Sequence, residues 1–432
     1  MILFKNATIS AGITKERQVD ILFDDKIIEV REDSITPPVD AIIIDLEGKF
    51  VLPGAIDVHT HFRSDKDNWQ NHFFNASKAA AMGGITYMAD GSCNTETPLT
   101  EGYDFPEVAR AYENNSLIDY GIWGMITSDD YPYYNEEISE LAKKGVVGVE
   151  FYLYSNNNAI SPLDYEEILE LFTDFSNSQI LFGVFPLDFP TYYKSKGSSP
   201  EDIGAFQFEA VKKLFRRSQE TKVHLFNIVS PEIVDFVMNS TKKYHCTYDV
   251  NPHNFLDNRD GIYLPGVQDD NSSLTLDNLI QTGKVPSIST DSGFINQDLN
   301  YTDENYAGIV NYLDLQYMIP FLFSEYYLTR RMTLGNLERM IAGNPAKILG
   351  IEHVKGGFEK EKDADFIVID PKLKEDLIDD YSSFKGREIN CKVTQTYLRG
   401  EKIYDILEGV QDQRGFGKLV KRNFQATTLN YY

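Results

Sequence analysis

The chain has 432 residues, a formal net charge of −25, and an ordinary globular balance of 42% apolar and 25% charged residues. Its length allows one large domain and a smaller one. The negative charge argues against a nucleic-acid partner, because phosphate binding requires clustered Lys and Arg side chains.

The cysteines and apolar runs predict a cytoplasmic protein with no membrane association. Cys93, Cys246 and Cys391 lie far apart and form no CxxC pair, which argues against a disulfide framework or a zinc knuckle. The N-terminus lacks the basic segment and long apolar stretch of a signal peptide. No run approaches the roughly 18 uninterrupted apolar residues of a membrane span.

Both ends of the chain have the texture of a small β-sheet domain. Residues 1–52 contain short apolar or alternating runs such as VDILFDDKIIEV and AIIIDLEGKFVL, separated by turn residues. Residues 357–432 return to this pattern with DADFIVID and CKVTQTYLRGEKIY. We predict one small β-sandwich domain formed by both chain termini, which requires that its two boundary points lie close in space.

The segment between them, residues 53–356, alternates strand-like and helix-like runs. Eight runs resemble buried parallel strands: AIDVHTHF, GGITYMADG, DYGIWGMI, VVGVEFYLY, QILFGVFPL, KVHLFNIV, HCTYDV and VPSISTD. Helix-like segments such as FPEVARAYENN and DYEEILELFTDF fall between most of them. This alternation predicts an α/β fold, a (β/α)8 TIM barrel, whose active site lies at the C-terminal ends of the strands.

Metal-binding side chains fall at those strand ends. His59 and His61 end the first predicted strand, and residues two apart on a strand point to the same side. Two neutral imidazoles suit zinc and similar divalent ions, and Asp291 at the end of the eighth strand can add an oxygen ligand. A His-x-His pair alone is a weak signal, but the barrel pattern and the distant STD point the same way.

Motifs along nearly the whole chain resemble a dihydroorotase of the amidohydrolase superfamily. They are VLPGAIDVHTHFR, AAAMGGITYMADGSCNTETP, GVVGVEFYL, TYDVNPHNFL, ISTD, GNPAKILGI and DADFIVID. The resemblance implies a metal-dependent hydrolase of cyclic amides with a barrel and a small β domain. The implied reaction is the interconversion of dihydroorotate and N-carbamoyl-aspartate.

The resemblance implies a first metal ion held by the His-x-His pair, the strand-eight aspartate and a carboxylated lysine on strand four. His59, His61 and Asp291 match, and Glu150 stands at the lysine position, where its carboxylate can imitate the carbamate. Glu150 can equally be a solvated or ion-paired carboxylate. Asp291 would be the catalytic residue, taking a proton from water and passing it to the leaving nitrogen.

The second metal site of that family is missing from the sequence. Its strand-five and strand-six histidine positions fall on Phe185 and Asn227, and His224 would point to the opposite strand face. We therefore predict at most one divalent metal ion, with zinc as the first choice.

The resemblance also implies substrate-binding residues for a carboxylate group. Arg63, Asn94 and His253 match these positions, and arginine is a good bidentate partner for a carboxylate. Each has a simpler alternative: ion pairing for Arg63, a turn for Asn94 and a structural loop for His253. The family's TDHAPH is replaced by TDSGFI, with Ser292 and Ile295 in place of both histidines.

Three hypotheses remain open at this stage. The first is a dihydroorotase-type hydrolase acting at a single ion on a small cyclic amide that carries a carboxylate. The second is a catalytically inactive homologue with an assembly role, as a homodimer or with aspartate transcarbamoylase. The third is an amidohydrolase for another cyclic or acyclic amide.

Overall fold

The computed structural model describes residues 1–65, 68–155, 157–187, 203–216, 220–240, 245–252, 270–293, 312–377, 384 and 386–424. Among these residues, no helix is both long and apolar enough to span a membrane. His253 and Ile295 lie outside the described residues.

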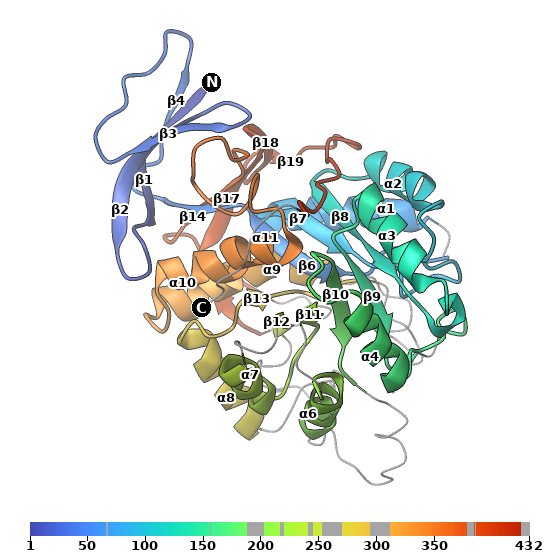
Figure 1. Cartoon of the computed structure of the whole chain (residues 1–432). Helices are drawn as coiled ribbons and strands as arrows, with labels where there is room; N and C mark the ends of the chain where they lie inside the picture. Colours follow the sequence, from blue (N-terminus) through green and yellow to red (C-terminus); the bar gives the residue numbers. More distant parts are fainter. Residues whose placement is uncertain are drawn as a thin grey trace.

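The eight predicted strands form a nearly closed parallel barrel (Figure 1). The strands are β6 (Ala55–Thr60), β7 (Ile85–Asp90), β8 (Asp119–Met125), β9 (Gly148–Tyr152), β10 (Leu181–Phe185), β11 (Lys222–Leu225), β12 (His245–Val250) and β13 (Ser287–Ile288). They pair in chain order, and the first and last meet where His61 and Gly293 form a parallel bridge. The His61 N–H donates to Ser292 O at 2.8 Å, so the seam closes beside the predicted metal ligands.

Helices follow most of the strands and surround the barrel. They are α1 (Trp69–Gly83), α2 (Phe105–Glu113), η1 (Ser128–Asp130), α3 (Tyr134–Lys144), α4 (Tyr165–Asp174), α6 (Ile203–Leu214), α7 (Pro231–Ser240) and α8 (Asp270–Gln281). After β13 come α9 (Leu313–Leu322), η5 (Phe323–Leu328), α10 (Leu334–Glu338), η6 (Arg339–Gly343) and α11 (Asn344–Leu349).

Helix α4 shows how the sequence sets these elements. Asp164 accepts hydrogen bonds from the Glu166 and Glu167 N–H groups, and the Glu167 carboxylate accepts from the Asp164 N–H. This reciprocal capping box satisfies N–H groups that the first turn of a helix leaves unpaired. Ile168 and Phe172, four residues apart, then point to the same side and are buried against the barrel.

A nine-stranded sheet is built from both ends of the chain, as predicted. Its strands are β1 (Ile2–Ser10), β2 (Glu16–Phe23), β3 (Ile27–Arg31), β4 (Ile42–Asp45), β5 (Phe50–Pro53), β14 (Phe366–Asp370), β17 (Lys392–Leu398), β18 (Glu401–Asp405) and β19 (Gly409–Val410). Strand β14 pairs antiparallel with both β5 and β17, which joins the N-terminal and C-terminal strands. The pair β15 (Glu375–Asp376) and β16 (Glu388–Ile389) forms a separate two-stranded sheet. The division at residues 52 and 356 stays a prediction about domain boundaries.

A buried ion cluster connects this sheet to the barrel. Lys355 Nζ lies 2.6 Å from Asp119 at the start of β8, 2.8 Å from Asp363, and 2.6 Å from Asp365 just before β14. Arg399 pairs with the same Asp119 carboxylate. Lys355 and Asp119 are each 1% exposed, so each charge depends on its partners rather than on water.

Candidate active site

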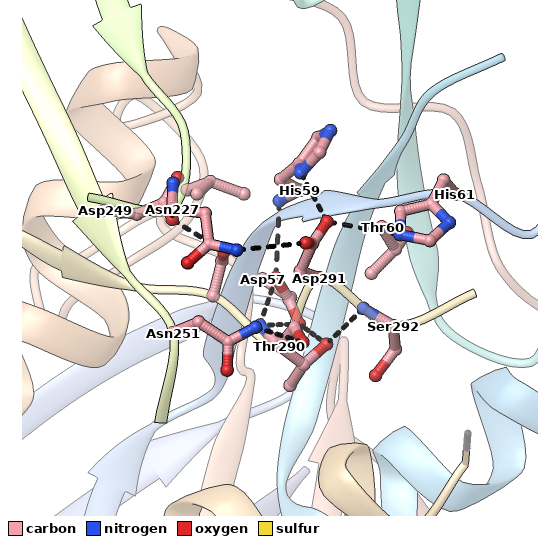
Figure 2. Close-up of polar contacts among 12 residues, drawn as sticks. Asp57, His59, Thr60, His61, Asn227, Asp249, Asn251, Thr290, Asp291 and Ser292 are labelled. Carbon is pink, nitrogen blue, oxygen red and sulfur yellow. Dashed lines mark hydrogen bonds and ion pairs between the residues drawn. The ribbon is translucent and has the colours of Figure 1, made fainter. Parts of the chain in front are cut away.

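Asp291 lies between the two predicted histidine ligands at the mouth of the barrel. Its Oδ1 atom is 3.1 Å from His59 Nδ1 and 3.2 Å from His61 Nε2, as Figure 2 shows. The two imidazole rings lie with their centroids 6.0 Å apart. The predicted strand geometry therefore brings His59, His61 and Asp291 together.

Burial and charge act in opposite directions on these groups. Burial alone would lower the pKa of His59, but the carboxylates of Asp291 and Glu150 raise it well above its ordinary value. Burial alone would raise the pKa of Asp291, but the two imidazoles hold it far below its usual range. Both shifts favour a negative carboxylate that faces positive or electrophilic partners.

Glu150 faces the other side of His59 from inside the barrel. Its Oε2 atom is 3.8 Å from His59 Nε2, and its side chain is fully buried. The Ser92 N–H donates to Oε1 at 3.1 Å, and the Tyr152 hydroxyl lies 3.5 Å from Oε2. A buried carboxylate is stable only with hydrogen-bond donors and a positive partner. For Glu150 the positive partner is a protonated His59 or a cation bound beside it.

Asn94 contacts His61, although the resemblance implied that it binds substrate. Its amide Nδ2 lies 2.9 Å from His61 Nδ1 and donates to His61 O at 3.0 Å. The same ring is approached by Gly293, where a Cβ atom would collide with His61 Nδ1 and O. The structure thus shows that Asn94 and Gly293 fix the imidazole of His61, and the substrate role of Asn94 stays a prediction.

Asp57 and Thr290 hold the backbone beside Asp291 and were not recognised in the sequence. The Asp57 carboxylate accepts from the Thr290 hydroxyl at 2.6 Å and from the Thr290 N–H at 3.1 Å. Asn251 donates to Thr290 O at 2.9 Å. Burial raises the pKa of Asp57 to about 7, although these hydrogen bonds oppose the shift. Asp57 was detectable, because it shares the inward face of β6 with His59.

A second buried network reaches Asp291 from β11 and β12. Asp249 accepts from His224 Nε2 at 3.0 Å and from the Asn227 N–H at 3.0 Å. The Asn227 amide donates to Asp291 Oδ2 at 3.3 Å. Asn227, where the resemblance implied a histidine ligand, therefore contacts the site.

Phe226 supplies an aromatic wall. Its ring stacks on His59 with centroids 3.9 Å apart and an interplanar angle of 12°, and its edge meets Trp123. Gly183 lies so close that a Cβ atom there would collide with the Phe226 ring. One face of His59 is thus covered by hydrocarbon.

Arg63 lies in the loop that follows β6. Its Nη2 atom donates to Thr97 O at 2.7 Å, while Nη1 is buried and has no hydrogen-bond partner among the described residues. A buried guanidinium nitrogen without an acceptor is costly, so it favours a ligand oxygen. The role of Arg63 in substrate binding stays a prediction, and that of His253 lies outside the described residues.

The donor atoms of the site, imidazole nitrogens and carboxylate oxygens, are of the types that bind a divalent metal ion. Both ring nitrogens of His59 are buried, and neither makes a hydrogen bond of regular geometry among the described residues, although Nδ1 faces the Asp291 carboxylate at 3.1 Å. In a tetrahedral site, donors about 2.1 Å from an ion lie roughly 3.4 Å from one another, close to the two separations around Asp291 Oδ1. No choice of one donor atom each from His59, His61 and Asp291 puts all three atoms within 4.8 Å of one another. Binding of one ion by all three residues therefore requires the two imidazoles to move closer to each other.

Another acidic cluster has tighter spacing but a different explanation. Asp119, Asp363 and Asp365 form the one group in the described part of the chain with three possible ligand atoms within 4.8 Å. Lys355 Nζ already contacts all three carboxylates. The cluster is therefore a structural ion network.

Comparison with known proteins agrees with this architecture. A sequence model of the amidohydrolase family matches residues 50–172 and 260–403, which is more than half of the chain. An allantoinase from Bacillus licheniformis is 25% identical over 443 residues, covering 92% of this chain and 95% of its own. A dihydroorotase from Pyrococcus furiosus is 24% identical over 396 residues, covering 87% of this chain and 86% of its own. The comparisons therefore do not single out dihydroorotase.

Solved structures show the same fold. An L-hydantoinase (dihydropyrimidinase) from Arthrobacter aurescens superposes with a TM-score of 0.84 at 22% sequence identity. The match covers 98% of this chain and 99% of that one.

Proposed function

The chain belongs to the amidohydrolase family, and on that premise we propose that it hydrolyses a C–N bond of a cyclic amide at a single divalent metal ion. One observation carries the proposal above the others. His59 is buried between two carboxylates, with Nδ1 3.1 Å from Asp291 and Nε2 3.8 Å from Glu150, and neither nitrogen makes a hydrogen bond of regular geometry among the described residues. Two carboxylates around such an imidazole favour a bound cation.

The residues divide the chemistry between them. His59, His61 and Asp291 would hold the ion, with Glu150 beside His59 as a further carboxylate. When bound, a divalent ion polarises the amide carbonyl and lowers the pKa of water. Asp291 accepts a proton as the water oxygen attacks the carbonyl carbon, and it returns that proton to the nitrogen as the C–N bond breaks.

We infer one ion rather than two from the residues that stand at the expected ligand positions of a second ion. Phe185 and Asn227 stand where the resemblance implied histidines, and neither offers an imidazole. The Phe226 ring covers one face of His59. Zinc is our first choice, because imidazole and carboxylate donors suit it.

Dihydroorotate is the substrate that we test first. The Nη1 atom of Arg63 is buried without a hydrogen-bond partner among the described residues, which favours a substrate carboxylate. The names of the relatives make allantoin and hydantoins the alternatives.

A catalytically inactive homologue is the second candidate. The observation that favours it is the loss of the second-ion ligands at Phe185 and Asn227. In that case the fold would serve assembly, as a homodimer or with aspartate transcarbamoylase. Light scattering of the purified protein, alone and with that enzyme, tests both partnerships.

The decisive experiment combines metal content with turnover. Protein supplied with zinc, manganese or cobalt is analysed for bound metal and assayed with dihydroorotate, allantoin and hydantoin. We expect close to one ion per chain and turnover of one of these rings. Two ions per chain would contradict the single-ion site, and bound metal without turnover of any ring would favour the inactive homologue.

A further inference from the structure

We propose that Asn227 is a positioning residue that aims the carboxylate of Asp291, and that a buried clamp fixes Asn227 for this task. The inference rests on the proposed function, in which Asp291 moves the proton. It assigns a role to Asn227, which in the sequence was notable only because the resemblance implied a histidine ligand there.

The two oxygens of Asp291 have different partners. Oδ1 faces the imidazoles of His59 and His61 at 3.1 and 3.2 Å, while Oδ2 accepts from the Asn227 amide at 3.3 Å (Figure 2). A partial rotation of the carboxylate would move Oδ1 away from the imidazoles and break the amide contact of Oδ2. The Asn227 donor therefore selects one orientation, and catalytic groups lose efficiency when their orientation is lost.

The backbone of Asn227 is held on both sides. Its N–H donates to Asp249 Oδ1 and its carbonyl accepts from Gln207 Nε2, each at 3.0 Å. Gln207, fully buried in α6, also accepts from the Val229 N–H at 3.0 Å. Asn227 itself has φ 52°, a left-handed conformation that asparagine tolerates better than most residues.

Asp249 anchors the clamp in the barrel wall. It is fully buried and accepts from His224 Nε2, the Asn227 N–H and the Ser289 hydroxyl, each at 3.0 Å. His224 Nδ1 in turn lies 2.8 Å from the Thr247 hydroxyl. Hydrogen-bonded networks of this kind hold a unique geometry when their members are satisfied.

The clamp connects neighbouring strand ends. His224 lies in β11, Asp249 lies in β12, and Ser289 follows β13 directly. Asp291 is two residues beyond Ser289, so the same network reaches it through the backbone and through Asn227. An uncharged amide donor here performs the positioning that outer-shell partners perform for metal ligands.

Two variants remove the donor in different ways. Asn227→Gly deletes the side chain while tolerating the positive φ, and Asn227→Asp keeps the shape but replaces the donor with an acceptor. Asn177→Gly is the matched control, because Asn177 is exposed and also has a positive φ, 63°. Circular dichroism and thermal melting establish that each variant folds.

We expect both Asn227 variants to lower kcat about 10- to 100-fold while KM changes less than about threefold. Asn177→Gly should leave both constants unchanged. Crystal structures of Asn227→Gly and Asn227→Asp should show the Asp291 carboxylate rotated away from its wild-type orientation. A kcat within about threefold of wild type in both variants would overturn the positioning role.

The structural measurement separates this inference from the proposed function. If the wild type hydrolyses no cyclic amide, the proposed function fails and the crystal structures alone decide the role of Asn227. An unchanged Asp291 orientation in either folded variant would then refute it. If Asn227→Gly does not fold, the nearly isosteric Asn227→Asp gives the same decision.

Discussion

The carboxylate of Asp291 contacts both imidazoles of the site and an amide donor. Asp291→Asn keeps the shape but cannot accept a proton from water. We expect kcat to fall about 10²- to 10⁴-fold, the range over which a general base contributes. Steady-state kinetics on the ring that the wild type hydrolyses, with metal content measured in parallel, checks the result.

Asp412→Asn provides the comparison for that substitution, because the Asp412 side chain is 78% exposed and forms a surface ion pair with Lys78. It should leave kcat unchanged. Equal activity of Asp291→Asn and wild type, at equal metal content, would remove Asp291 from the chemistry.

Gly293 marks a contact that no larger residue can make. A Cβ atom there would collide with Nδ1 and O of His61, so Gly293→Ala must displace the imidazole or open the barrel seam. We expect activity to fall at least tenfold, since misplacement by about 1 Å can cost 10²-fold in rate. Turnover assays should show no such loss for Gly343→Ala, whose Cβ would lie 3.6 Å from Gly356 O, an ordinary van der Waals contact.

The site could be predicted from the sequence only where local spacing determines it. His59 and His61 share one face of a strand, and the strand order places Asp291 beside them, so their meeting was predictable. The contact of Asn94 with His61 was not, because it depends on how two loops approach each other. The bond from Asn227 to Asp291 likewise depends on a positive φ that the sequence does not reveal.

At the scale of elements, the contact between α10 and β1 contains a buried carboxyl group, that of Glu338. Ser10 donates to the Glu338 carboxylate through its hydroxyl at 2.5 Å and its N–H at 3.3 Å. Burial raises the pKa of Glu338 to about 7, from a usual 4.5, despite these donors. The folded protein therefore binds this proton more tightly than the unfolded chain does.

This shift sets the sign of a pH effect. Below pH 4.5 the carboxyl is protonated in both states and costs nothing, whereas stability falls as pH rises from 4.5 to 7. Glu338→Gln removes the ionisation, so we expect its free energy of unfolding at pH 8 to exceed that of wild type by up to about 3 kcal/mol. Urea unfolding at pH 5 and pH 8 measures the difference, which should shrink at the lower pH.

The exposed Glu136 offers a matched control on another helix. Glu136→Gln should change stability by less than about 0.5 kcal/mol at either pH. If Glu338→Gln destabilises the protein equally at both pH values, ionisation of Glu338 does not lower the free energy of unfolding at high pH.

At the scale of the molecule, the barrel was predictable because its periodic signals are repeated. Eight apolar runs with helical segments between most of them leave few alternatives, and all eight became parallel strands. The pairing of β14 with β5 could be inferred only from similar texture at both chain ends. The ion cluster around Lys355 was not predictable, because its members come from segments more than two hundred residues apart.

That cluster connects β8 of the barrel to the segment that leads into β14, so its loss should lower the stability of the protein. Lys355→Met would leave the carboxylates of Asp119, Asp363 and Asp365 buried without their shared ammonium group. Breaking a buried ion network by removing one partner costs about 3–5 kcal/mol. We expect that loss in the free energy of unfolding by urea at pH 8, while Lys374→Met, an exposed pair with Glu388, changes it by less than about 0.5 kcal/mol. If the two lysine variants unfold at the same urea concentration, the cluster contributes nothing to holding the sheet and the barrel together.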